Sequence, residues 1–367
     1  MLVLMVFGTR PEAIKMAPLF RVLRASTKVS VELCVTGQHR EMLDQILDFF
    51  SIRPDYDLNL MIPGQSLNQL LGKVISHVGD LIEQTNPDLV LVHGDTTTAV
   101  GAAIAAFQTG TRIGHVEAGL RTHDIKTPFP EEFNRSTIGR MTDLHFAPTD
   151  RSAANLVAEG VPIHNIHITG NTVIDALISA AEMSSDLLPI SIEPTQRLVL
   201  ITSHRRENFG SGVLQICDAV AELAKAYPDV VFYFPVHLNP KILVPATELL
   251  RDIENVWLAK PCGYGEFVAL LNRCYLVLTD SGGIQEEAPS IGKPVLVMRE
   301  STERPEAVEA GTVLLVGSST EKIVENAVRL LEDQVLYQQM SEAENPFGDG
   351  TASTKILTVL EELNESS

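Results

Sequence analysis

The sequence predicts an α/β, doubly wound fold that is divided into two halves. Short runs of Val, Leu and Ile alternate with helical patterns along the chain. Many of these runs are continuously apolar, as in strands buried on both faces of a parallel sheet. The chain has 367 residues, which is long for a single core, so two domains are expected.

The individual elements follow from these patterns in chain order. Strands are predicted at residues 2–7, 30–36, 88–93, 111–116, 143–147, 166–170, 197–202, 229–235, 275–279, 294–298 and 312–316. Helices are predicted between them, at 13–25, 66–84, 97–109, 171–182, 213–226 and 321–333. The segment 183–196 is rich in Ser and Pro and separates the halves. We therefore predict a domain of residues 1–169, to which a C-terminal helix at 350–367 returns, and a second domain of residues 170–349.

Composition excludes several classes of protein. The formal net charge of −19 argues against a non-specific nucleic-acid binder, which needs clustered Lys and Arg. No apolar run reaches the length of about 18 residues that a membrane span needs. The four cysteines form no C-x-x-C pair, which fits a reducing cytoplasm and argues against a zinc ribbon or a disulfide framework.

A nucleotide half-site is indicated at Asp280–Pro289, which reads DSGGIQEEAP and follows a strand. Ser281, Gly282 and Gly283 would let a phosphate approach the backbone N–H groups of a helix start. Glu287 could accept two hydrogen bonds from a ribose diol. The alternative is a plain tight turn with surface glutamates.

The first strand ends in a second candidate anion site. Thr9 and Glu12 have the spacing of a capping box, and Pro11 fits the first helical turn. Arg10 and Lys15 lie at this predicted helix start, where an anion would bind. The alternative is a capped surface helix.

Three carboxylates follow strands or open a helix and could transfer protons. Asp95 ends the run LVLVHGD, Glu117 ends RIGHVE, and Glu131 opens the helical pattern of PEEFNR. In a parallel sheet these loops share one edge, and crowded carboxylates raise at least one pKa. Each could instead be an N-cap or a surface charge.

Basic residues follow the strands of the second half. His204, Arg205 and Arg206 come directly after one strand, His237 after the next, and Arg304 lies close after the Ser-Gly-Gly loop. A metal site at the His93/Asp95 and His115/Glu117 pairs is a weaker reading, since no H-x-x-x-H spacing occurs. No G-x-S-x-G motif supports a serine hydrolase.

Seven motifs together resemble the bacterial non-hydrolysing UDP-N-acetylglucosamine 2-epimerases. They are FGTRPEAIK at 7–15, HGD at 93–95, GHVEAGLR at 114–121, PEE at 130–132, HRRE at 204–207, DSGGIQEE at 280–287 and ERPE at 303–306. The resemblance implies a glycosyltransferase-B-like fold of two Rossmann-like domains around a deep cleft. It also implies a cytoplasmic homodimeric isomerase that needs no NAD or metal and supplies ManNAc units for surface polysaccharides.

The reaction implied is interconversion of UDP-GlcNAc and UDP-ManNAc through elimination of UDP to 2-acetamidoglucal, followed by re-addition. By the family match, Asp95, Glu117, Glu131 and His204 are catalytic candidates. The remaining substrate-binding candidates are Arg10, Lys15, Phe267, Ser281, Gly282, Gly283, Glu287 and Arg304.

Two departures from the family pattern affect ligand recognition. Cys262 stands where relatives can place Gln near the uracil. Some relatives bind a second UDP-GlcNAc as an activator, and Gln38, Arg205, Arg206 and His237 lie in the matching motifs. However, Glu41 and Gly64 occupy positions where some relatives carry Gln and Arg. A hydrolysing homologue, a glycosyltransferase of the same fold and a non-catalytic sensor remain alternatives.

Overall fold

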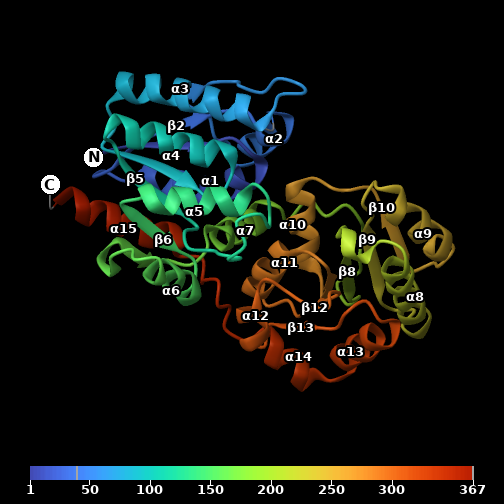
Figure 1. Ribbon diagram of the computed structural model, residues 1–367. Coiled ribbons are helices and arrows are strands. Elements are labelled where there is room, and N and C mark those ends of the chain that lie inside the picture. The colour runs from blue at the N-terminus through green and yellow to red at the C-terminus, as the bar shows by residue number, and fades with distance from the viewer. Residues whose placement is uncertain (39, 366–367) are drawn as a thin grey trace. The chain divides into compact units, whose positions relative to one another are not determined.

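The computed structural model describes residues 1–38 and 40–365, which form two compact α/β units (Figure 1). Unit 1 comprises Met1–Ala176 and Phe347–Ser367, and unit 2 comprises Leu177–Pro346. The predicted divisions lie at 169/170 and 349/350, whereas the compact units divide inside a helix, after Ala176, and after Pro346. Residues 366 and 367 of the predicted C-terminal helix lie outside the described residues.

Unit 1 is built on a seven-stranded parallel sheet of order β3-β2-β1-β4-β5-β6-β7. Its strands are β1 (Leu2–Phe7), β2 (Ser30–Val35), β3 (Tyr56–Asp57), β4 (Leu89–His93), β5 (Arg112–Val116), β6 (Leu144–Ala147) and β7 (Ile166–Ile168). Its helices are α1 (Arg10–Ala25), α2 (Arg40–Phe49), α3 (Leu67–Thr85), α4 (Thr97–Thr109), α5 (Glu131–Met141), α6 (Asp150–Ala158), η1 (Ile163–Asn165), the start of α7 (Thr172–Met183), and α15 (Ala352–Glu365).

Both faces of this sheet are covered by helices, as its continuously apolar strands require. Leu4, Val6, Val90 and Val92 point into a core with α3 and α4, and these two helices lie side by side in Figure 1. The C-terminal helix α15 packs on α1. Asp175 fixes the start of α15, since its carboxylate accepts hydrogen bonds from the backbone N–H groups of Ala352 (3.2 Å) and Ser353 (2.7 Å).

Unit 2 contains a six-stranded parallel sheet of order β10-β9-β8-β11-β12-β13. The strands are β8 (Leu198–Thr202), β9 (Val231–Pro235), β10 (Val256–Ala259), β11 (Leu276–Thr279), β12 (Val295–Val297) and β13 (Val313–Leu315). The helices are η2 (Arg206–Asn208), α8 (Ser211–Ala226), α9 (Pro240–Leu250), α10 (Tyr264–Arg273), α11 (Gly282–Glu287), η3 (Ala288–Ile291), α12 (Pro305–Glu309), α13 (Thr320–Glu332) and α14 (Gln334–Ser341).

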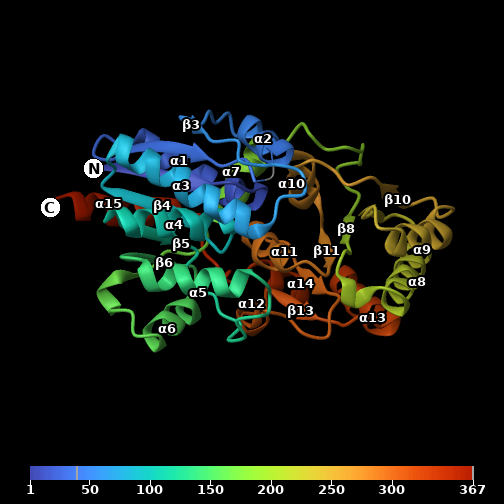
Figure 2. The ribbon, with the colours of Figure 1, turned by 45° about the horizontal axis from the view of Figure 1, so that its top comes forward.

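The core of unit 2 lies between its sheet and the helices α8, α9, α13 and α14. Phe232 and Phe234 of β9 are fully buried there. Helix α10 packs against β8 from the opposite face, and Figure 2 shows α10 and α11 across the sheet from α8 and α9. Among the described residues, no helix combines the length and apolarity needed to cross a bilayer.

Each sheet reverses its strand order at one point. The reversal lies between β1 and β4 in unit 1 and between β8 and β11 in unit 2. In open parallel sheets, ligands bind outside the carboxyl ends of the strands at this point. The topology therefore predicts that ligands bind at the loops that begin at Gly8 and Gly94 in unit 1, and at those that begin at Ser203 and Asp280 in unit 2.

The predicted α/β class with parallel sheets is confirmed, and every predicted strand is present within a few residues. Two edge strands, β3 and β10, were not predicted. β3 has only two residues, and Trp257 in β10 is half exposed. β3 is too short to show a pattern, and β10 is an apolar run of only four residues, VWLA, which by pattern alone is weak evidence for a strand.

We expect acid to destabilise this fold because two histidines are buried side by side. His115 of β5 and His145 of β6 are paired across neighbouring strands and are fully buried. Burial lowers the pKa of His115 to about 3 and that of His145 to about 4, from an ordinary 6.5. The unfolded chain therefore binds more protons below pH 6.5. The free energy of unfolding should therefore decrease below pH 6.5, by up to about 1.4 kcal/mol for each histidine per unit that the pH falls.

Urea unfolding at pH 7 and pH 5 measures this loss. His145→Leu should show a smaller drop in stability between the two pH values than the wild type. His77 is exposed on α3, so His77→Gln should keep the wild-type drop. An unchanged drop in His145→Leu would remove His145 as a source of the acid sensitivity.

Candidate functional site

A buried carboxylate joins the two loops at the strand reversal of unit 1. Glu12 lies in the first turn of α1, where Thr9 caps the helix and the predicted capping box is formed. Its carboxylate accepts hydrogen bonds from the N–H groups of Gly8 (3.0 Å) and Thr9 (2.8 Å) and from Thr96 Oγ1 (2.7 Å). Burial raises the pKa of Glu12. The loops after β1 and β4 are therefore held together by this side chain.

Glu117 follows β5 directly and lies among polar groups from three other segments. Its Oε2 forms an ion pair with Lys15 Nζ of α1 and accepts a hydrogen bond from Asn171 Nδ2 (2.9 Å). His93 Nε2 lies 3.8 Å from the same oxygen. Burial opposes ionisation, but the charges of Lys15 and His93 and the hydrogen bonds from Lys15 and Asn171 together outweigh it and lower the pKa of Glu117. Glu117 is therefore an anion at neutral pH.

Asp95 lies in the neighbouring loop, two residues after β4. Its carboxylate is paired with Arg135 of α5, and its backbone oxygen accepts a hydrogen bond from Asn134 Nδ2 (2.8 Å). Burial raises the pKa of Asp95 despite the charge of Arg135, and the negative charge of Glu117 raises it further. The structure thus brings Asp95 and Glu117 together, and their pKa values are shifted in opposite directions.

The other predicted residues of unit 1 lie on α5, α1 and β5. Glu131 is the first residue of α5, whose initial turns also carry Asn134 and Arg135. Arg10 is the first residue of α1 and is partly exposed. His115 Nε2 lies 2.7 Å from the carbonyl oxygen of Gly94. His115 therefore donates to the loop that precedes Asp95.

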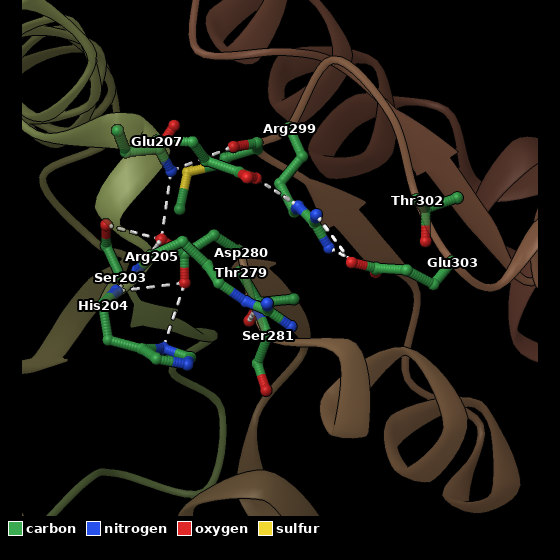
Figure 3. Close-up of polar contacts among 12 residues, drawn as sticks. Ser203, His204, Arg205, Glu207, Thr279, Asp280, Ser281, Arg299, Thr302 and Glu303 are labelled. Atoms are coloured by element: carbon green, nitrogen blue, oxygen red, sulfur yellow. Dashed lines mark hydrogen bonds and ion pairs between the residues drawn. The ribbon is translucent and has the colours of Figure 1, made fainter. Parts of the chain in front are cut away.

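Asp280 organises the strand reversal of unit 2 (Figure 3). It is fully buried at the end of β11. Its oxygens accept hydrogen bonds from the side chains of Ser203 and Asn208 and from the backbone N–H groups of His204 and Arg205, each at 3.0 Å. His204 Nδ1 lies 3.1 Å from Oδ1. Although burial acts in the other direction, these donors lower the pKa of Asp280.

Two guanidinium groups lie beside Gly282 of the Ser-Gly-Gly loop. A methyl group placed on Gly282 would lie 3.4 Å from Arg205 Nη2 and 3.7 Å from Arg304 Cζ. Glycine therefore leaves this space open between the loop and both cations. Arg205 Nε is buried and has no hydrogen-bond acceptor among the described residues, whereas Arg304 Nε donates to Glu286 Oε1 at 2.6 Å. This arrangement can bind an anion through charge-assisted hydrogen bonds.

Arg299 connects the two loops that carry these guanidinium groups (Figure 3). It is buried two residues after β12. Its Nη1 and Nη2 donate to the carboxylate of Glu303 at 2.6 and 3.0 Å, and its Nε is paired with Glu207. The guanidinium lowers the pKa of Glu303 to about 2. Glu207 belongs to the loop of Arg205, and Glu303 precedes Arg304.

The remaining predicted residues of unit 2 lie at the Ser-Gly-Gly loop and α11, or earlier in the chain at α10. Glu287 ends α11, and its Oε1 would lie 3.1 Å from a methyl group on Gly283. Ser281 donates its backbone N–H to Thr279 Oγ1 at 2.9 Å. Phe267 is partly buried on α10, and Cys262 precedes that helix.

The candidates for an activator site are divided between the units. Gln38 belongs to unit 1, where its Oε1 accepts a hydrogen bond from Thr98 (3.0 Å). Arg205, Arg206 and His237 belong to unit 2. Arg206 is exposed at the start of η2, and His237 lies between β9 and α9. In residues 1–38 and 40–365, no three His, Cys, Asp or Glu side chains are grouped to hold a metal ion.

Sequence reasoning missed the residues that hold the candidate groups in place. Asn171, Arg135 and Arg299 each contact a strand-end carboxylate or a loop distant in the sequence. Position gave a usable signal for Arg299, because it closely follows a predicted strand. Arg135 had a weaker signal in its spacing of one helical turn from Glu131. Asn171 had none, since a single Asn before a helix reads as a cap.

The two units, each with its polar groups at a strand reversal, define an α/β protein of the glycosyltransferase-B-like class. The family model described as UDP-N-acetylglucosamine 2-epimerase matches residues 21–361. The chain belongs to this family.

Relatives match over the whole length of the chain. The UDP-N-acetylglucosamine 2-epimerase of Escherichia coli (strain K12) is 52% identical over 369 residues, which cover 98% of each chain. A crystal structure of the Neisseria meningitidis UDP-GlcNAc 2-epimerase bound to UDP-GlcNAc has 48% sequence identity and a TM-score of 0.86, covering 99% of this chain and all of that one. The Listeria monocytogenes structure of a putative UDP-N-acetylglucosamine 2-epimerase has 42% identity and a TM-score of 0.93, covering 100% and 97% of the two chains.

We expect Arg299→Lys to weaken anion binding without removing a charge. Lysine cannot make the bidentate contact with Glu303 while also binding Glu207, so the loops of Arg205 and Arg304 would lose their common anchor. The dissociation constant for inorganic pyrophosphate should rise by about tenfold, or about 1.4 kcal/mol. Calorimetric titration measures it. Arg329 is exposed on α13, so Arg329→Lys is the matched control. Equal affinities in the two variants would contradict the role of Arg299.

Proposed function

We propose that this protein interconverts UDP-GlcNAc and UDP-ManNAc without net hydrolysis. One observation carries the proposal beyond family membership. Asp95 and Glu117 lie in neighbouring strand-end loops, and the pKa of Asp95 is raised while that of Glu117 is lowered. Carboxyl groups whose pKa values are pushed apart can take separate acid–base roles at one pH.

The proposed reaction breaks and remakes two bonds on the sugar. A base removes the C2 proton, the C1–O bond breaks with its electron pair going to the UDP oxygen, and a C1=C2 double bond forms. In the reverse sense, a proton is delivered to the other face of C2 and the diphosphate oxygen bonds again to C1. The C2 proton is only weakly acidic, so stabilisation of the departing diphosphate is essential.

The acid–base roles follow from the electrostatics of unit 1. We assign proton transfer at C2 to Asp95, whose raised pKa favours exchange near neutral pH. Glu117 remains an anion beside the positive charge that develops at C1. We assign the proton on the other face to Glu131, at the start of α5. Lys15 keeps Glu117 ionised. Arg10 would contact the diphosphate of the substrate.

The UDP portion is assigned to unit 2. Arg205 and Arg304 flank the space beside Gly282 and would bind the diphosphate together with Ser281 and Gly283. His204 would lie beside the departing oxygen. Glu287 would accept hydrogen bonds from the ribose, and Phe267 would pack on the uracil.

The cellular setting is part of the same proposal. We propose a homodimer in the cytoplasm, where the product supplies ManNAc units for surface polysaccharide. The rival activity is hydrolysis to UDP and free ManNAc, in which water traps the glucal intermediate.

Proton NMR in D2O tests the proposal directly. UDP-GlcNAc incubated with the purified protein, with EDTA present and no NAD added, should give UDP-ManNAc that carries deuterium at C2. Asp95→Asn and Glu117→Gln should each lower turnover by about 100-fold or more, the first because it removes the group that transfers the C2 proton and the second because it removes the negative charge beside C1. Glu309 is exposed on α12, so Glu309→Gln should behave as the wild type.

Other products would redirect the assignment. UDP plus free ManNAc as the main products would identify a hydrolysing enzyme. No change in the sugar while UDP still binds would favour the glycosyltransferase or the sensor. Unchanged turnover in either carboxylate variant would refute the acid–base roles.

A second UDP-GlcNAc is proposed as an activator that binds through Gln38, Arg205, Arg206 and His237. If so, UDP-ManNAc alone should be converted only after a lag, and trace UDP-GlcNAc should abolish that lag. Gln38→Ala should weaken the stimulation. Hyperbolic kinetics with UDP-ManNAc and no response to added UDP-GlcNAc would argue against the activator.

A further inference from the structure

Asn171 is buried and contacts Glu117, yet the proposed chemistry gives it no role. Its side chain is 3% exposed. Asn171 Nδ2 donates to Glu117 Oε2 at 2.9 Å. Asn171 Oδ1 accepts a hydrogen bond from the backbone N–H of Val173 at 3.1 Å, in the first turn of α7. The two ends of the side-chain amide are therefore used separately, one for the helix and one for the carboxylate.

The backbone of Asn171 is held by the segment in which the chain returns to unit 1. Its N–H donates to the carbonyl oxygen of Phe347 at 2.7 Å. On either side of this bond, Gly170 has a φ of +87° and Gly348 a φ of +129°. A methyl group on Gly170 would lie 3.2 Å from Gly348 Cα. These backbone conformations and this close approach both require glycine, so the outgoing and returning segments fix where Asn171 lies.

Glu117 is held on one oxygen. Both Lys15 and Asn171 bind Oε2, and Oε1 lies on the side of Gly94, 3.7 Å from where a methyl group on that glycine would be. Gly94 immediately precedes Asp95. The two donors on Oε2 therefore orient Oε1 toward the loop that carries the other carboxylate.

We propose that Asn171 is a positioning residue that orients the Glu117 carboxylate and ties it to the paired segments at Gly170 and Gly348. The inference rests on the proposed function, since it assigns a task to Asn171 within that reaction. The ammonium group of Lys15 supplies charge, but it lies at the end of a flexible side chain. Asn171 supplies direction, because its backbone and both ends of its amide are fixed.

Asn171→Ser separates the two uses of the amide. Serine can still accept the hydrogen bond from Val173 N–H at the helix start, but it has no amide N–H to reach Glu117. A donor to the charged form lowers a carboxyl pKa, so its loss raises that pKa. The other charged or titratable groups around Glu117 are Lys15, His93 and Asp95, and all three remain in the variant.

Two measurements test the inference. Carbon-13 NMR titration of the glutamate carboxyl groups, with Glu117→Gln to assign the signal, should show a higher Glu117 pKa in Asn171→Ser. The kcat for epimerisation should fall by roughly tenfold to a hundredfold, as expected for a lost hydrogen bond to a charged group. Pyrophosphate affinity, which depends on unit 2, should not change.

Asn155→Ser is the matched control. Asn155 Nδ2 donates to the carbonyl oxygen of Gly119 at 2.9 Å, so this variant loses a similar amide bond two residues from Glu117 without touching the carboxylate. It should keep the wild-type Glu117 pKa. An unchanged pKa in Asn171→Ser would overturn the inference, and so would an equal shift in Asn155→Ser.

The inference and the proposed function fail in different ways. If the wild type forms no deuterated UDP-ManNAc, the proposed function fails while the titration still reports whether Asn171 holds Glu117. If the wild type epimerises the sugar and Asn171→Ser does so at the same rate, only the positioning role fails.

Discussion

A carboxylate removed from water must receive hydrogen bonds or ion pairs, or it loses its charge. Three buried carboxyl groups in or beside the strand-end loops are subject to this constraint: Glu12, Glu117 and Asp280. Each obtains its partners from a loop or helix distant in the sequence. The same interactions that make burial tolerable therefore fix the loops around each site. If any of these groups lost its partners, the geometry of its neighbours would be lost with it.

The two units differ in the charged groups that lie near their strand reversals. In unit 2, Asp280 accepts hydrogen bonds from four donors, while Arg205 and Arg304 lie beside Gly282 and Arg304 is also paired with Glu286. In unit 1, the cations Lys15 and Arg135 form ion pairs with Glu117 and Asp95. One unit thus presents positive charge, which suits an anion, and the other presents carboxyl groups, which suit proton transfer.

Much of this arrangement could be predicted from the sequence, for a physical reason. Buried parallel strands are continuously apolar, so a polar residue such as Asp95 or Asp280 at the end of such a run marks the edge of the sheet. Arg135 and Arg299 could not be assigned, because the partner of a long cation depends on which loops the fold brings beside it. Asn171 was missed because the segment that fixes it begins at Phe347, more than 170 residues later. The strand β10 was missed because its run of four apolar residues, VWLA, is too short to identify a strand by pattern alone.

The backbone around Glu117 indicates how strongly its position is specified. Glu117 has a φ of +63°, a region that non-glycine residues seldom occupy. Such a conformation costs on the order of 1–3 kcal/mol and persists only where its surroundings impose it. Gly94, in the neighbouring loop after β4, and Gly119, two residues after Glu117, also have positive φ values. A methyl group on Gly119 would lie 2.2 Å from the carbonyl oxygen of Ser152. A carboxylate needed only for its charge could sit on relaxed backbone. The strained backbone, the ion pair with Lys15 and the amide of Asn171 together restrict the direction of the Glu117 carboxylate, and direction matters where a negative charge must face the carbon at which positive charge develops.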